Sequence, residues 1–260
     1  RSPSMPSLRD VRSKIKSVKN IQQITQAMKM VAAARLRRVQ ARVTAGKPYS
    51  EKMRQLVGTL GSAAGQIQHP LLEQREGGLI ALVLVSSDKG LCGSYNGNIL
   101  RRGVRFATEH KERGVKLITV GKKSTDFYRR RHYDLHASFN QIGVAAPFSE
   151  VQAIADAITG LFLSGTVNEV HLGYTEFINT IQQRPTVVKF LPIEPPKSEQ
   201  PARGEVEYLF EPAAEELLAT LLPRYVNAQV YHMLLESVAS EFGARMTAMS
   251  NATDNAGELI

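Results

Sequence analysis

The sequence predicts a mixed α/β protein in which a long antiparallel coiled coil of the N- and C-terminal helices carries a doubly wound, mostly parallel α/β domain. Apolar residues recur at steps of three and four near both ends of the chain, which is typical of coiled-coil helices. Between these ends, short apolar runs alternate with helical patterns, which favours a parallel sheet covered by helices on both faces. We therefore divide the sequence into an N-terminal coiled-coil helix at 1–62, an α/β domain with a Pro-rich connector at 63–205 and a C-terminal coiled-coil helix at 206–260.

The first segment is expected to form an unusually long helix. Neither Gly nor Pro occurs from Ser7 to Ala45. At 1.5 Å per residue this run alone is roughly 57 Å long, whereas a compact chain of this size has a radius of gyration of about 18 Å. The helix should therefore project beyond the globular domain, with a kink or short break at Gly46 and Pro48. Its predicted apolar seam, with one slip in the spacing, consists of Leu8, Val11, Ile15, Val18, Ile24, Met28, Val31, Leu36, Val39 and Val43.

Buried strands are expected in the middle of the chain. The apolar run LIALVLVSS, which begins at Leu79, ends in a turn-forming segment and indicates a central strand. VKLITVG and EVHLGYTEF predict two more strands, and TVVKFLPI predicts an edge strand. The predicted helices between them cover residues 98–112, 122–131 and 149–163. The tract PIEPPKSEQPARG is an exposed connector, because proline removes a backbone donor and fixes φ.

The last segment predicts a second long helix. It begins near Glu211 and Pro212, where acidic residues suit the start of a helix, and Pro223 should kink or restart it. The apolar spacing then runs to Ile260 without a capping residue, so we expect the natural helix to be truncated there. The two terminal helices can bury their apolar stripes against each other as a coiled coil.

The charge distribution predicts an acidic partner. The chain has a formal net charge of +9 and a pI near 9.7. Residues 9–42 contain ten Lys or Arg and one acid, whereas residues 211–260 contain seven acids and two bases. Pairing between the two helices accounts for part of this charge. Arg9, Arg12, Lys16 and Lys19, however, form a separate stripe that calls for an external acidic surface.

The sequence predicts neither catalytic residues nor a cofactor or metal site. The glycines of SDKGLCGSYNG match neither the dinucleotide-binding nor the Walker pattern, and tight turn geometry explains them. The six histidines are scattered, and His132 with His136 lacks the intervening Glu of a zinc protease motif. Cys92 is the single cysteine, which excludes an internal disulfide and a cysteine-based zinc site. The chain is therefore not expected to be an enzyme by itself.

Two other classes of protein fit parts of the pattern. A basic coiled coil could bind nucleic acid, but no aromatic residue for base stacking occurs from Arg1 to Pro48. A nucleotide-binding α/β enzyme with helical arms would need a recognisable phosphate loop. Steep salt dependence of DNA binding would indicate the first class, and saturable nucleotide binding by the isolated chain would indicate the second.

Three long segments resemble the gamma subunits of F-type ATP synthases. They are SLRDVRSKIKSVKNIQQITQAMKMVAAARLRR, SSDKGLCGSYNGN and ASEFGARMTAMSNATDNAGELI, and the order of elements agrees over the whole chain. The resemblance implies a non-catalytic central rotor shaft that turns inside a hexamer of alpha and beta subunits and couples proton-driven rotation to ATP synthesis. The implied partners are these subunits, the epsilon subunit and the c-ring, through which the shaft is peripheral to the membrane, and nucleic acid is not among them.

The resemblance also implies which residues contact partners. Contacts with the catalytic hexamer are implied for Met28, Lys29, Lys89, Cys92, Arg245, Asp254 and Asn255, to which the basic stripe adds Arg12 and Lys16. Contacts of the foot with the c-ring and the epsilon subunit are implied for Glu207 and Tyr208. The cysteine-bearing insertion of chloroplast gamma subunits is missing, and Met5 resembles an initiator. These features favour the cytoplasmic face of a bacterial plasma membrane over a mitochondrial or thylakoid membrane.

Overall fold

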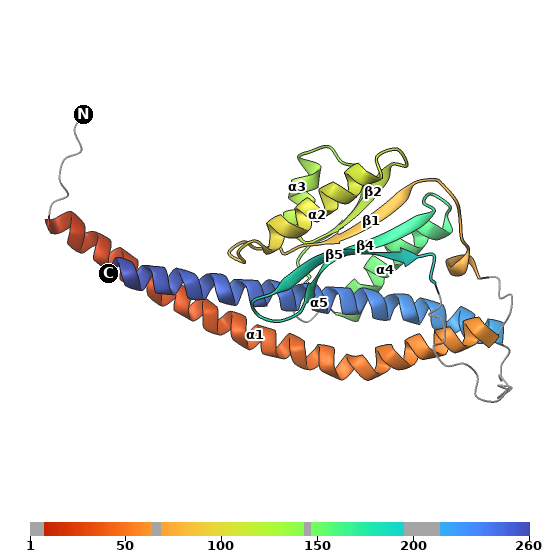
Figure 1. The fold of residues 1–260 in the computed structure, drawn as a ribbon, viewed down its shortest axis with the longest axis horizontal. Helices are drawn as coiled ribbons and strands as arrows, with labels where there is room; N and C mark the ends of the chain where they lie inside the picture. The colour runs from red at the N-terminus through yellow and green to blue at the C-terminus, as the bar shows by residue number, and fades with distance from the viewer. Residues whose placement is uncertain (1–7, 64–68, 143–146, 195–213) are drawn as a thin grey trace.

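The computed structural model describes residues 8–63, 69–142, 147–194 and 214–260. Two long helices, α1 (Leu8–Ala63) and α5 (Ala214–Leu259), lie side by side in antiparallel directions and form a stalk. The N-terminal end of α1 and the C-terminal end of α5 extend together beyond the α/β domain, which packs on one side of α5 (Figure 1). The predicted fold class is confirmed.

The domain is built on a five-stranded sheet with the strand order β3-β2-β1-β4-β5. Neighbouring strands from β3 to β4 are parallel, and β5 joins the edge antiparallel to β4. The central strand is buried at every residue, as its continuous apolar sequence requires. The strands are β1 (Ile80–Val85), β2 (Val115–Val120), β3 (Leu135–Phe139), β4 (Glu169–Phe177) and β5 (Gln183–Leu191). The predicted edge strand is β5, whereas β3 was not predicted from the sequence.

Helices cover both faces of the sheet, which makes it doubly wound. The side chains of Ile80, Leu82 and Leu84 point to one face, where they pack with α2 (Tyr95–Glu109) and α3 (Lys122–Arg129). The alternate residues of β1 point to the other face, where α4 (Phe148–Leu163) and α5 lie. Alternation along a strand thus supplies two cores from one apolar run.

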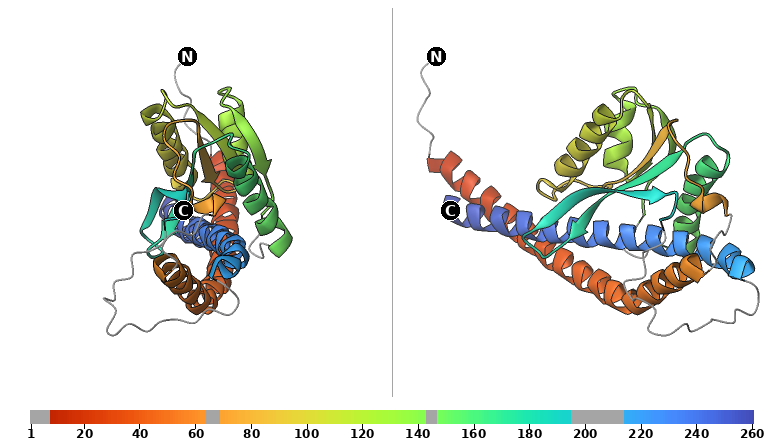
Figure 2. Two further views of the ribbon diagram at one scale, coloured as in Figure 1. Left: turned by 90° about the vertical axis from the view of Figure 1, so that its right-hand side faces the viewer. Right: turned by 45° about the vertical axis from the view of Figure 1, so that its right-hand side comes forward.

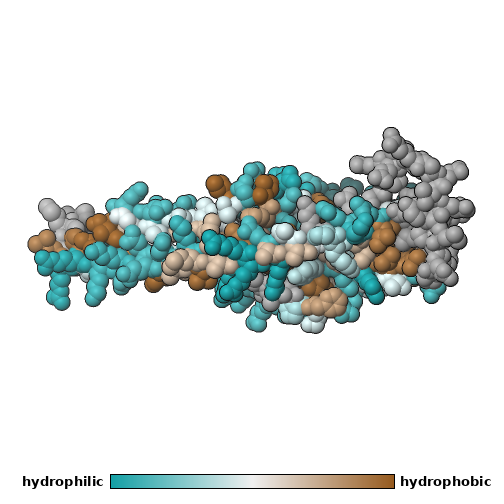
Figure 3. Space-filling model, turned by 90° about the horizontal axis from the view of Figure 1, so that it is seen from below, coloured by the Kyte–Doolittle hydropathy of each residue, from teal (hydrophilic) through white to brown (hydrophobic). Residues whose placement is uncertain are grey.

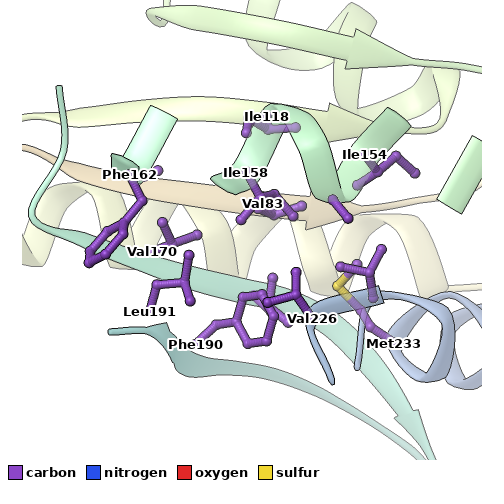
Figure 4. Packing of buried hydrophobic residues seen from close by; sticks show 14 of the residues in the cluster. Val83, Ile118, Ile154, Ile158, Phe162, Val170, Phe190, Leu191, Val226 and Met233 are labelled. Atoms are coloured by element: carbon purple, nitrogen blue, oxygen red, sulfur yellow. The ribbon is translucent and has the colours of Figure 1, made fainter. Parts of the chain in front are cut away.

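Helix α5 belongs to the core of the domain as well as to the stalk. Val226 and Met233 of α5 pack in the same buried cluster as Val83 of β1 and Ile158 of α4 (Figure 4). The predicted boundary at 205/206 therefore separates sequence segments that share one packing unit. A helix common to both parts joins the stalk rigidly to the domain.

Both terminal helices are longer without interruption than predicted. The sequence predicted a kink or a short break at Gly46 and Pro48. Helix α1 is continuous through Pro48, so no break occurs, and Figure 2 shows the helix changing direction in its C-terminal half, as the predicted kink requires. Helix α5 likewise continues through Pro223, so no restart occurs there. Each proline removes one backbone hydrogen bond from its helix without ending the helix. The predicted start at Glu211 and Pro212 lies outside the described residues.

The predicted slip in the seam of α1 is also wrong. Ile24 and Val31 are 59% and 53% exposed, whereas Thr25 and Ala32 beside them are buried. The buried positions keep the steps of three and four through Leu36 and onward without a slip. A small or hydroxyl-bearing side chain fits between closely packed helices. The regular spacing of the coiled coil, and not the position of each large apolar residue, therefore decides which side chains of α1 are buried.

Candidate functional site

The predicted contact residues fall in two described regions, the stalk and the loop between β1 and α2. We call the second region the β1–α2 loop and define it as residues 86–94. Glu207 and Tyr208 lie outside the described residues. Each region is built by segments that are far apart in the sequence.

The seam of the stalk changes character along its length. Near the α/β domain it is apolar, and Leu36 and Val39 pack there against Phe242 of α5. Further out it becomes polar. The hydroxyl oxygens of Thr25 and Thr253 are 2.8 Å apart and share a hydrogen bond. Next to them the Gln22 amide lies close to Gly257, because a Cβ built on this glycine would be 3.1 Å from the Gln22 Nε2.

Lys29 lies in this polar part of the seam. Its Nζ donates a hydrogen bond of 3.0 Å to the Ser250 hydroxyl on α5. The ammonium group is therefore engaged within the chain, which the sequence pattern did not indicate. Met28 beside it is half-buried, whereas Arg12 and Lys16 are exposed. Figure 3 shows polar side chains projecting along one side of the stalk end, with apolar side chains exposed beside them.

The β1–α2 loop is tied to the sheet at its base. Asn96 Oδ1 accepts hydrogen bonds from the backbone N–H and the hydroxyl of Ser87, at 3.1 and 3.0 Å. Asp88 Oδ1 accepts another, of 2.9 Å, from the backbone N–H of Lys122 at the start of α3. We call residues 89–93 the tip of the loop. Within it Lys89 is exposed, whereas Cys92 is buried. Burial raises the pKa of the Cys92 thiol, which disfavours the reactive thiolate form.

The tip of the loop contacts the stalk through Arg245. Arg245 Nη1 donates to Glu241 Oε1 at 2.5 Å, and Nη2 donates to the carbonyl oxygen of Gly90 at 3.1 Å. Burial raises the pKa of Glu241, and the adjacent guanidinium opposes that shift. The fold thus brings Arg245 to the loop that contains the predicted residues Lys89 and Cys92. The two atoms that meet belong to Gly90 and Arg245, which are 155 residues apart in the sequence.

The remaining predicted residues lie near the end of α5. Asp254 and Asn255 are exposed on the part of the stalk that extends past the domain. Within the described residues, no group of three or more potential ligand side chains could hold a metal ion. Each helix in these residues is too short or too polar to span a lipid bilayer. Ser250 is a seam residue that sequence reasoning missed, and its hydroxyl lies three positions before that of Thr253 on the face of α5 that meets α1.

Known proteins match the chain along almost its whole length. A sequence model described as ATP synthase matches residues 7–260. The ATP synthase gamma chain of Desulforamulus reducens is 48% identical over 257 residues, which cover 98% of this chain and 89% of that protein. The chain belongs to the ATP synthase gamma-chain family. The gamma chain of Pelotomaculum thermopropionicum is 44% identical over 256 residues, with coverage of 98% and 89%.

Solved structures agree with membership of the gamma-chain family. The central stalk of the mitochondrial ATP synthase of Tetrahymena thermophila, described with its c-ring, superposes with a TM-score of 0.68 at 27% identity, covering 88% of this chain and 99% of that chain. The rotor of the Euglena gracilis mitochondrial enzyme superposes with a TM-score of 0.63 at 19% identity, covering 96% and 92%. The second likeness concerns the fold alone. The resemblance predicted from the three sequence segments is confirmed.

Proposed function

We propose that this gamma-family chain is the central rotor shaft of an F-type ATP synthase, coupling rotation of a c-ring to ATP synthesis in a catalytic hexamer. The carrying observation is a two-helix stalk that extends beyond the α/β domain and shares helix α5 with it. Membership of the gamma-chain family supports the same role. The chain is a non-catalytic rotor subunit, so its task is mechanical.

Torque must pass between the domain and the stalk, and α5 supplies that joint. Its N-terminal half is held by apolar packing in the core of the domain. Further along, the Ser240 hydroxyl donates to the carbonyl oxygen of Thr175 at 2.9 Å, and the Thr247 hydroxyl donates to that of Thr180 at 3.0 Å. These contacts bind α5 to β4 and to the turn that follows it, so turning the domain turns the stalk.

The proposed partners meet different parts of the shaft. The alpha and beta subunits of the hexamer would surround the stalk and contact Met28, Lys89 and the basic residues of α1. The epsilon subunit and the c-ring would contact the foot, to which the sequence resemblance assigns Glu207 and Tyr208. We place the assembly on the cytoplasmic face of a bacterial plasma membrane, which the bacterial relatives support.

Reconstitution tests this function. The full chain mixed with purified alpha and beta subunits should form a complex of one gamma chain with six other subunits and stimulate ATP hydrolysis. Failure to form any such complex would contradict the proposal. Saturable nucleotide binding by the isolated chain, or DNA binding with a steep salt dependence, would instead favour the two other classes of protein.

The basic stripe should act as a distributed surface, because a rotor that meets three equivalent partners in turn cannot depend on one deep contact. Each exposed ion pair contributes about 0–1 kcal/mol and is screened over roughly 8 Å at physiological ionic strength. Replacing Arg12 alone with Gln should leave assembly unchanged. Replacing Arg9, Arg12, Lys16 and Lys19 together should weaken association with the hexamer, most clearly when binding is measured across a salt series.

A matched control for this prediction lies on the α/β domain. Lys111, Lys123, Arg129 and Arg130 are also exposed, so replacing these four with Gln removes the same charge elsewhere. The control variant should bind the hexamer like the parent. Equal weakening by both variants would show that net charge alone matters, and the basic stripe would then have no special role.

A further inference from the structure

We infer that Arg245 is a positioning residue that holds the tip of the β1–α2 loop closed against α5, and thereby sets how Lys89 and Leu91 face a partner. The sequence resemblance assigns Arg245 to a direct contact with the hexamer. The structure instead shows a guanidinium that is engaged inside the chain. Only the statement about a partner rests on the proposed function; the closing of the loop is a property of the chain itself.

The position of Arg245 favours an internal role. The residue is 9% exposed, and its guanidinium bridges the Glu241 carboxylate and the Gly90 carbonyl oxygen. Its Cζ also lies 5.3 Å from the centroid of the Phe242 ring. With both ends of the fork hydrogen-bonded and one face toward an aromatic ring, little of the group is left for another chain.

The closed loop needs a contact to keep it closed. Leu91 has a φ of 62°, in the left-handed region that is unfavourable for a branched apolar side chain, and it is 64% exposed. Its strained backbone follows directly after Gly90, whose carbonyl Arg245 binds. On the other side, a Cβ built on Gly93 would lie 3.8 Å from the Ala248 Cβ. The tip therefore lies directly on α5. The hydrogen bond from Arg245 offsets the free-energy cost of the strained Leu91 backbone.

Opening would be confined to the tip. Ser87 and Asp88 at the base are bound to Asn96 and to the start of α3, so they stay with the domain. Cys92 lies within the tip, so opening must also break the contact of 3.1 Å between its sulfur and the Asn96 Nδ2. Since Cys92 is the single cysteine of the chain and is 2% exposed, its rate of alkylation reports how often the tip opens.

The test measures alkylation of Cys92 by iodoacetamide in the full chain under native conditions. Arg245→Lys should retain the ion pair with Glu241, but its single nitrogen replaces a fork and loses the bond to Gly90. We expect alkylation at least about tenfold faster than in the parent, the size of effect that loss of a charged hydrogen bond gives. Arg245→Gln, which removes the charge as well, should be faster still.

Electrostatics alone predicts that replacing Arg245 slows the alkylation of Cys92, whereas opening of the tip predicts that it becomes faster. The two explanations can therefore be told apart. Burial is the largest cause of the raised pKa of Cys92, and the nearby Arg245 charge lowers that pKa. Removing the charge without opening the loop would therefore leave less thiolate and slow the alkylation. A rate for Arg245→Gln at or below that of the parent would overturn the inference.

A second comparison separates opening of the tip from general loss of stability. Leu218→Ala weakens the core at the other end of α5, 27 positions before Arg245, and should leave the alkylation rate unchanged while lowering the unfolding midpoint. If Leu218→Ala accelerates alkylation as much as Arg245→Lys, global unfolding explains the exposure and the inference is wrong. Helix content from circular dichroism shows whether each variant is folded.

The assembled complex tests the part that concerns a partner. Arg245→Lys should assemble with the hexamer but stimulate ATP hydrolysis less than the parent, because Lys89 and Leu91 are no longer held in place. Faster alkylation with full stimulation would support the closing of the loop and overturn its role toward a partner. If the parent itself forms no complex, the proposed function fails, while the alkylation result on the isolated chain still decides the inference about Arg245.

Discussion

Replacing Val39 with Asp is expected to lower the free energy of unfolding by about 3 kcal/mol or more. Val39 is 0% exposed in the apolar part of the seam, where it packs in one cluster with Leu36, Ala239 and Phe242. A carboxylate there would lose its hydration, and Arg35, whose Cζ lies 5.6 Å from the centroid of the Phe242 ring, would offset only part of that cost. The stalk should open first, and the loss should appear in denaturant unfolding followed by circular dichroism, because most of the helix content lies in α1 and α5.

Val31→Asp is the matched control for this prediction. It makes the same substitution in the same helix, but Val31 is 53% exposed, so its carboxylate would stay hydrated. The expected change is within about 0.5 kcal/mol of the parent. Equal destabilisation by the two variants would mean that Val31 is buried in solution and that the seam follows the slipped spacing of the large apolar residues.

Replacing Gly121 with Ala is expected to cost about 3 kcal/mol or more, because two separate obstacles add up. Gly121 has a φ of 95°, and a Cβ there would lie 2.2 Å from the backbone oxygen of Ser86. Backbone cannot rotate away as a side chain can, so β1 or the start of α3 would have to move. Urea unfolding of the full chain measures the cost.

Gly93→Ala separates the two obstacles. Gly93 also has a positive φ, of 55°, but the nearest atom to its Cβ would be 3.8 Å away, an ordinary contact. Only the backbone conformation opposes this substitution, which should therefore cost about 1–2 kcal/mol. If Gly121→Ala lowers the free energy of unfolding no more than Gly93→Ala does, small shifts relieve the close approach to Ser86, and the prediction for Gly121 is wrong.

Local patterns in the sequence predicted much of the fold. The uninterrupted apolar run after Leu79 required a strand buried on both faces, and the structure places it at the centre of the sheet. The absence of Gly and Pro from Ser7 to Ala45 required a helix longer than the domain. β3 was missed because only part of it is apolar and it lies at the edge of the sheet, where its alternate residues stay exposed.

The sequence proposed members of the candidate site but not the contacts between them. The resemblance to gamma subunits singled out Lys29, Lys89, Cys92 and Arg245. Neither spacing nor composition could indicate that Lys29 binds Ser250 across the seam or that Arg245 binds the backbone of Gly90. These two contacts join residues that are 221 and 155 positions apart, and the sequence carries no local signal for them.

The sequence by itself determined the family and, apart from β3, the kinds and order of the main elements, because periodicity and motif identity are properties of neighbouring residues. Tertiary structure decided which face of each helix is buried. In α1, packing at 3.5 residues per turn places Thr25 inside and Ile24 outside, against their hydrophobicity. In α5, the N-terminal stretch packs in the core of the domain and the stretch that follows it packs in the seam of the stalk. Side-chain burial depends on what lies opposite, and only the folded chain supplies that neighbour.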